Sequence, residues 1–293
     1  MVRYDASGVN KGRQYVRRKG PAGAAVAGGG GILVLILSLF FGVDLGGVTG
    51  GGSAAPSGVV DEDVCDDGEI EGFMCFLMGD LNETWSAEFA DFGATYEPAF
   101  LNIFTGSVST NGCGTASSEV GPFYCPAPQD RQVYIDLDFF NDLAGRDFGA
   151  PGDFAQAYVV AHEVGHHVAT LVGDADFIRS EQAADPSRSN ELQVLLELQA
   201  DCYAGVWANS ASQRIVPSSG LPIIEPNDIE EGLAAAEAVG DDRIQIARTG
   251  ETDPHDWTHG SSSQRQTAFR QGLLGGGADS CTFDLIQQVT ELA

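Results

Sequence analysis

Residues 159–168, VVAHEVGHHV, contain a His-Glu-x-x-His motif formed by His162, Glu163 and His166. On a helix, His162 and His166 lie one turn apart on the same face, so both imidazoles can reach one metal ion. Glu163 is offset by one residue, where it can face a water on that ion. Zinc lowers the pKa of such a water toward about 7, and a carboxylate can then accept its proton. The motif predicts two Zn²⁺ ligands and a general base.

A third metal ligand must come from elsewhere in the chain. The metzincin pattern is excluded, because Val172 stands where its third His would be and Ala169 where its Gly would be. The other common arrangement is a Glu on a later helix, with a second carboxylate one turn further on that orients a ligating imidazole.

Two segments have this Glu-x-x-x-Asp spacing. The first, EQAAD at 181–185, runs directly into Pro186, which places it at a helix end or in a loop. The second, ELQAD at 197–201, lies in an apolar stretch, where a buried carboxylate is costly unless a metal or a partner compensates it. We therefore expect Glu197 to be the third ligand and Asp201 to orient a histidine, with Glu181 as the alternative ligand.

A metallopeptidase also needs a donor aimed at the oxyanion that develops on the scissile carbonyl. We expect His259 to be this donor, because it lies just before a Ser-rich helix start whose positive end adds to its effect. Arg265 is the alternative donor, and a competing role for His259 is capping that helix or packing against Trp257. His167 lies on a different helix face and is expected to pack or to form a hydrogen bond.

The elements that hold these residues are mainly helices. Apolar residues at helical spacing predict a helix over 153–172 with Asp153 as its N-cap. Three later helices each have a Ser or Asp at the expected start: Ser187 or Ser189 for a helix to about 209, Asp228 for one to 238, and Ser261 for the last. A short helix is expected at 82–92 and strands at 99–104 and 131–137. The fold class is α+β, a single mostly helical domain with a small antiparallel sheet.

Several stretches in order resemble the bacterial neutral zinc metallopeptidases, which are single-pass proteins with an extracytoplasmic catalytic domain. They are GPFYCP at 121–126, VYIDLDFF at 133–140, AYVVAHEVGHHV at 157–168, ELQADCYAGVWA at 197–208 and HGSSSQRQTAF at 259–269. The resemblance implies a zincin-like domain with His162, His166 and Glu197 as zinc ligands and Glu163 as the catalytic base. Ala169, where this family would have Gln, is a departure outside the ligand set.

The charge distribution is strongly uneven. The chain has 42 Asp and Glu against 15 Lys and Arg, a formal net charge of −27, which argues against a nucleic-acid-binding surface. Residues 1–20 contain six of the basic residues and one acidic residue, so the remaining 9 basic and 41 acidic residues give 21–293 a net charge of −32. A basic N-terminal segment and a strongly acidic remainder of the chain therefore meet near residue 20.

An uncharged apolar run occupies residues 21–43 at this boundary. Its 23 residues, at about 1.5 Å per helical residue, are long enough to span a bilayer core of roughly 30 Å. A cleaved signal peptide with an apolar core at 32–43 is the rival interpretation. We expect a basic cytoplasmic head at 1–20, a transmembrane anchor at 21–43, a Gly/Ser/Pro linker at 44–58 and an extracytoplasmic domain at 59–293.

Six cysteines all follow the apolar run, an even set that favours disulfides in an exported domain. Proximity along the chain suggests the pairs Cys65 with Cys75 and Cys113 with Cys125. That leaves Cys202 to pair with Cys281.

The function expected is a membrane-anchored zinc endopeptidase that acts on protein or peptide outside the cytoplasm, by attack of a zinc-bound water with Glu163 as general base. One alternative is a catalytically inactive, zinc-stabilised binding or assembly module, because no pro-segment or specificity pocket is recognisable. A second alternative is a zinc amidase that acts on cell-wall peptide. The sequence leaves the oligomeric state open.

Overall fold

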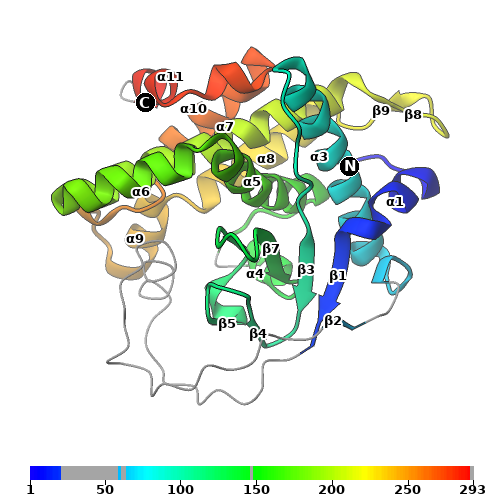
Figure 1. Cartoon of the computed structure of the whole chain (residues 1–293), viewed down its shortest axis with the longest axis horizontal. Helices are drawn as coiled ribbons and strands as arrows, with labels where there is room; N and C mark the ends of the chain where they lie inside the picture. Colours follow the sequence, from blue (N-terminus) through cyan, green and yellow to red (C-terminus); the bar gives the residue numbers. More distant parts are fainter. Residues whose placement is uncertain (21–58, 61–63, 146–147, 291–293) are drawn as a thin grey trace.

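The computed structural model describes residues 1–20, 59–60, 64–145 and 148–290, which form a layer of helices packed on one main sheet. The long helices α5 (Asp153–Val172) and α7 (Ser189–Gln213) lie in the middle of this layer, in contact with α8 (Pro226–Ala238) and α10 (Ser262–Gly275) (Figure 1). The fold class is therefore α+β and mostly helical, as the sequence predicts.

The remaining elements surround this central group. The other described helices are α1 (Ala6–Gly12), α3 (Glu69–Asp91), α4 (Phe139–Ala144), α6 (Asp174–Ala184), α9 (Asp241–Thr249) and α11 (Phe283–Thr290). The described strands are β1 (Val16–Lys19), β2 (Val59–Val60), β3 (Leu101–Phe104), β4 (Ser107–Ser109), β5 (Thr115–Ser117), β6 (Phe123–Cys125), β7 (Gln132–Asp136), β8 (Ile215–Val216) and β9 (Leu221–Pro222).

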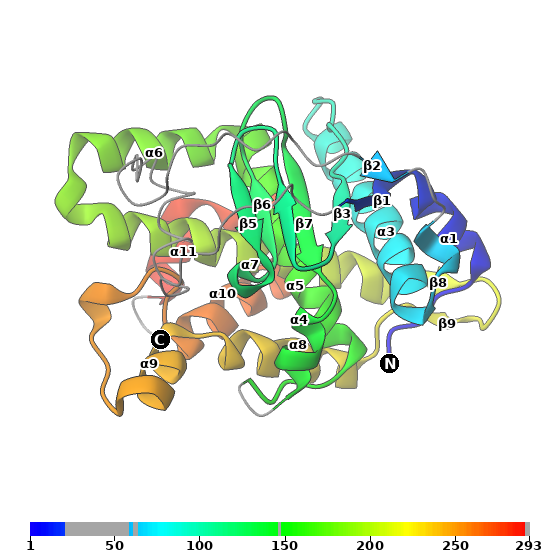
Figure 2. The same ribbon diagram turned by 90° about the horizontal axis from the view of Figure 1, so that it is seen from below.

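The main sheet has the strand order β2-β1-β3-β7-β6 and contacts α5 through β6 and β7 (Figure 2). Its central strands β1, β3 and β7 are parallel neighbours, and only the outer strands β2 and β6 pair in the antiparallel sense. The prediction of a small antiparallel sheet is therefore wrong for the centre of this sheet. Alternation along a strand indicates which face is buried, but it does not specify the direction of the neighbouring strand.

Helix α3 is longer than the sequence suggests. The sequence predicts a short helix at 82–92, whereas α3 spans Glu69–Asp91. Residues 72–82 of α3 are buried on all sides, and Met74, Leu77 and Met78 are completely inaccessible to solvent. A helix that is apolar all round has no one-sided stripe, so helical periodicity does not reveal it.

Residues 1–20 belong to the same folded body as the rest of the described chain. Strand β1 pairs in parallel with β3, with Val16 opposite Leu101, and α1 packs on α3. Basic side chains of this segment also form exposed ion pairs with the acidic body, including Arg13 with Asp66 at 2.9 Å. The structure thus packs residues 1–20 on the described body, whereas the sequence predicts a head set apart from it by the residues at 21–58.

The predicted anchor at 21–43 and the predicted linker at 44–58 lie outside the described residues. Among the residues that are described, no helix combines the length and the apolar character needed to cross a bilayer.

The predicted helix starts are confirmed at some positions and wrong at others. Ser261 caps α10 and forms a capping box with Gln264. Asp153 is the first helical residue of α5, not its N-cap, and its carboxylate accepts a hydrogen bond from the Val2 N–H at 2.7 Å. Asp228 lies in the first turn of α8, where it completes a capping box with the true N-cap, Glu225. The prediction for Asp153 is wrong because its carboxylate binds a distant partner, the N–H of Val2, and no local sequence pattern encodes this contact.

The three expected disulfides are confirmed: Cys65–Cys75, Cys113–Cys125 and Cys202–Cys281. The last joins α7 to the segment before α11 across a sequence separation of 79, so it restricts the unfolded chain most.

The packing of α1 on α3 predicts that residue 12 must remain a glycine. A Cβ atom at Gly12 would lie 1.6 Å from the carbonyl oxygen of Cys75, so Gly12→Val should force the two helices apart. We expect the free energy of unfolding to fall by about 1–3 kcal/mol. The control is Ala6→Val, since Ala6 is exposed on the same helix. If thermal denaturation gave the same melting temperature for Gly12→Val and the wild-type chain, residues 1–20 would not be packed as described.

Candidate metal centre

The metal centre is built where α5 crosses α7 at very short range. A Cβ atom at Gly165 would lie 2.8 Å from the carbonyl oxygen of Ala200 and 3.0 Å from its Cα, so only glycine permits this approach. The contact lies within the His-Glu-x-x-His motif on α5 and within the Glu-x-x-x-Asp segment on α7. The side chains on either side of the crossing therefore face one another.

The three predicted zinc ligands meet at this crossing. The Nε2 atoms of His162 and His166 are 3.1 Å apart, and they lie 3.2 and 3.5 Å from Oε2 of Glu197. Ligand atoms bound tetrahedrally to one zinc at about 2.0–2.2 Å would be roughly 3.3–3.5 Å apart, so the residues present fit a single ion. All three side chains are buried, and among the described residues they form a group able to hold a metal. Glu181, the alternative ligand, lies on α6 outside this group.

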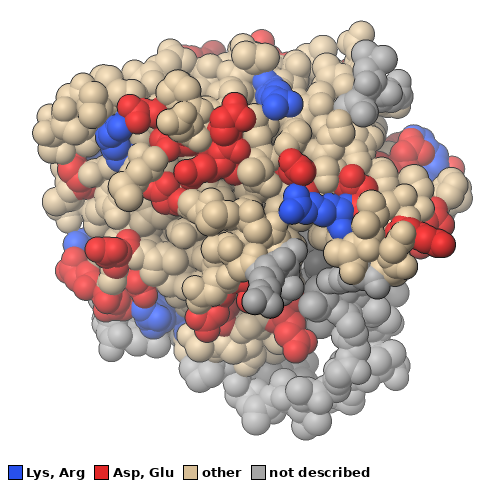
Figure 3. All heavy atoms as spheres, turned by 180° about the vertical axis from the view of Figure 1, so that it is seen from behind, with Lys and Arg blue, Asp and Glu red and all other residues tan. Residues whose placement is uncertain are grey.

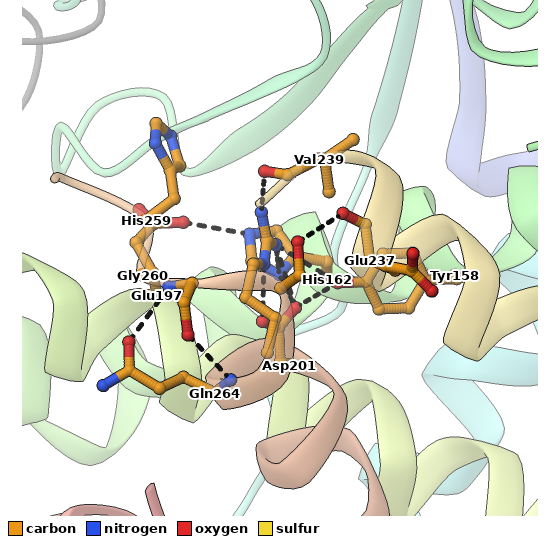
Figure 4. A network of polar contacts seen from close by, with 12 residues as sticks. Tyr158, His162, Glu197, Asp201, Glu237, Val239, His259, Gly260 and Gln264 are labelled. Carbon is orange, nitrogen blue, oxygen red and sulfur yellow. Dashed lines mark hydrogen bonds and ion pairs between the residues drawn. The ribbon is translucent and has the colours of Figure 1, made fainter. Parts of the chain in front are cut away.

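Asp201 contacts His162 on the side of its ring opposite the ligand group. Its Oδ1 atom lies 2.8 Å from Nδ1 of His162 and accepts a hydrogen bond from the Tyr158 hydroxyl at 2.5 Å (Figure 4). Burial alone would raise the pKa of this fully buried carboxyl, but the charges of Arg265 and His162 lower it to about 2. The ionised Asp201 therefore favours a proton on Nδ1, which leaves the Nε2 lone pair for a metal.

Arg265 does not take the role considered for it. The sequence suggested it as an alternative oxyanion donor, but its Nε and Nη2 atoms donate to the two oxygens of Asp201 at 2.8 and 3.0 Å. It is 4% exposed, and its other amino group donates to the carbonyl of Val239. Arg265 therefore neutralises the buried charge of Asp201.

Two residues of this centre were not recognised from the sequence as functional. Tyr158 lies one turn before His162 on α5, a spacing that could have indicated its hydroxyl as a partner for Asp201. Gln193 lies one turn before Glu197 on α7, is 4% exposed, and donates from Nε2 to Oε1 of Glu197 at 2.9 Å. The same one-turn spacing indicates its amide as a partner for Glu197.

Glu163 is buried beside the two histidines of its own helix, with 8% of its surface exposed. Burial raises the pKa of its carboxyl, while the nearby charges of His162 and His166 act in the opposite direction. A carboxylate with a raised pKa binds a proton more readily than one in water, as a general base requires.

The segment that carries His259 is held in place by Asp241, the first residue of α9. Oδ2 of Asp241 accepts hydrogen bonds from three successive backbone N–H groups, those of Thr258, His259 and Gly260, at 2.7, 2.6 and 3.1 Å. Its Oδ1 lies 3.4 Å from Nδ1 of His259. Burial tends to lower the pKa of His259, but the charges of Glu197 and Asp241 raise it overall. Glu197 and Asp241 are thus the negative charges that favour the protonated form of His259.

His167 follows the motif directly and has a structural role. Its Nε2 lies 2.7 Å from the carbonyl of Glu97, and its ring packs edge-on against Tyr96 and Tyr124. Burial lowers its pKa, which favours the neutral ring. The expectation that His167 packs and forms hydrogen bonds is confirmed.

Comparison with known proteins finds one matching family model and several relatives. A family model described as "Putative neutral zinc metallopeptidase" matches residues 4–283. "Uncharacterized protein YpfJ" of Escherichia coli (strain K12) is 40% identical over 266 residues, which cover 89% of each chain. "Uncharacterized protein Rv2575" of Mycobacterium tuberculosis (strain ATCC 25618 / H37Rv) is 49% identical over 189 residues, 64% of this chain and 62% of the relative. No solved structure matches the chain significantly.

The helix crossing predicts that Gly165→Ala damages metal binding as well as stability. The added methyl would contact the backbone of Ala200, so α5 and α7 must separate and the ligand atoms with them. We expect about 1–3 kcal/mol of lost stability and a lower zinc content after dialysis, measured by denaturation and by elemental analysis. Gln156→Ala, on the partly exposed side of α5, is the control. A Gly165→Ala protein with wild-type zinc content and stability would contradict the close approach.

Proposed function

This chain belongs to the neutral zinc metallopeptidase family, and on that premise we propose that it is a zinc-dependent endopeptidase. The observation that carries the proposal is the convergence of Nε2 of His162, Nε2 of His166 and Oε2 of Glu197, with Glu163 on the same helix. A bound zinc would supply Lewis-acid polarisation and an acidified water at this position.

The chain's own residues would supply the proton transfers. Glu163 accepts the proton of the attacking water and then delivers it to the amine that leaves when the peptide bond breaks. His259 donates a hydrogen bond or a proton to the carbonyl oxygen as negative charge develops on it. Asp201 and Tyr158 do not touch the substrate and act by fixing the ring of His162.

We also propose that the substrate is a protein or peptide outside the cytoplasm. Three disulfides pair all six cysteines, which supports an oxidising compartment. Acidic side chains dominate the face drawn in Figure 3, with few basic ones among them, and this supports the absence of a nucleic-acid partner. An anchor at 21–43 remains a prediction.

The proposed role of Glu163 is tested with Glu163→Gln. The amide keeps the shape of the side chain but does not accept a proton from water, so kcat should fall by about 100-fold or more while zinc content is unchanged. The measurement is hydrolysis of an unfolded protein, with a cell-wall peptide substrate assayed in parallel. Equal cleavage by wild type and variant would refute the mechanism. Bound zinc with no turnover of either substrate would instead favour a binding module.

The proposed role of His259 is tested with His259→Ala, which should lower kcat by about 100- to 1000-fold with little change in KM or zinc content. The matched control is His255→Ala, because His255 is exposed in the same segment. Steady-state kinetics on one peptide separates the two parameters. If both alanine variants had the same kcat, His259 would have no part in transition-state stabilisation.

A further inference from the structure

The two carboxylate oxygens of Glu197 have different partners. Oε2 faces Nε2 of His162 at 3.2 Å and Nε2 of His166 at 3.5 Å. Oε1 accepts a hydrogen bond from Nε2 of Gln193 at 2.9 Å. Gln193 is 4% exposed and Glu197 is 2% exposed, so water competes weakly for either group.

This asymmetry bears on how Glu197 binds a metal. A carboxylate coordinates through one oxygen or through both, and a second oxygen would fill a position that a catalytic zinc needs for water and substrate. Coordination through Oε1 as well would draw that oxygen away from the amide of Gln193. The buried N–H would then lose its acceptor, at a cost of about 1–3 kcal/mol.

A buried glutamine amide can donate its hydrogen bonds to acceptors that are not metal ligands. A second glutamine on the same helix shows this. Gln199 is two residues beyond Glu197 and completely buried. Its Nε2 donates to Oδ2 of Asp174 at 2.7 Å and to the carbonyl of Cys281 at 3.0 Å, and neither acceptor is a candidate zinc ligand. The two glutamines therefore have equal chemistry and similar burial but different targets.

We propose that Gln193 is a positioning residue that restricts Glu197 to a single coordinating oxygen and so keeps a position on the zinc open. The inference rests on the proposed zinc centre. It assigns to Gln193 a role in setting the number of metal ligands, beyond its contribution to helix packing.

The test compares Gln193→Met with Gln199→Met in the full chain loaded with zinc. Met matches the length of Gln and has no N–H donor. Zinc X-ray absorption should show one more oxygen in the first coordination shell of Gln193→Met than of wild type. The kcat for peptide hydrolysis should fall about ten- to a hundredfold, with KM nearly unchanged. Gln199→Met should lose stability but keep the wild-type coordination number.

Gln193→Ala, which removes the amide without adding bulk, provides the same comparison if the Met variant does not fold. Equal coordination numbers in wild type and the Gln193 variants would overturn the proposal. If wild type binds zinc but hydrolyses nothing, the proposed peptidase activity fails, and the absorption spectra still decide the role of Gln193. A wild-type chain that binds no zinc would overturn both.

Discussion

The close contact between α5 and α7 at Gly165 and Ala200 determines how near the three candidate zinc ligands lie to one another. Each helix fixes its own side chains at one-turn spacing, so the relative position of the two helices is the remaining variable. At this separation the ligand atoms of His162, His166 and Glu197 come within 3.5 Å of one another. A larger separation would leave two histidines on one helix and an uncompensated carboxylate on the other.

The crossing also creates a buried charge that the fold must neutralise. Asp201 is completely buried, and an isolated carboxylate there would be costly. Arg265 of α10 supplies the opposite charge with two hydrogen bonds, and Tyr158 supplies a third. The metal centre therefore depends on three helices from distant parts of the chain. The Cys202–Cys281 disulfide adds a covalent link next to Asp201, between α7 and the segment before α11.

The part of this site that could be predicted from the sequence is the part encoded by local spacing. His162, Glu163 and His166 lie about one helical turn apart, and α5 ends at Val172 as predicted, although it begins at Asp153, the residue predicted as its N-cap. Glu197 and Asp201 were recognisable because buried carboxylates are unusual in an apolar helix. The features that the sequence does not predict depend on contacts between distant segments. Arg265 binds Asp201, and Asp241 holds the backbone around His259. Strand β1 pairs with β3. Spacing along the chain carries no information about such partners.

The central claim is that one zinc ion is held between α5 and α7 by three side chains. Anomalous diffraction at the zinc edge from crystals of the wild-type chain tests it most directly. The account predicts one strong peak within about 2.0–2.2 Å of Nε2 of His162, Nε2 of His166 and a single oxygen of Glu197. Absence of a peak there, or a peak only at another acidic group such as that of Asp153, Asp228 and Glu231, would contradict it.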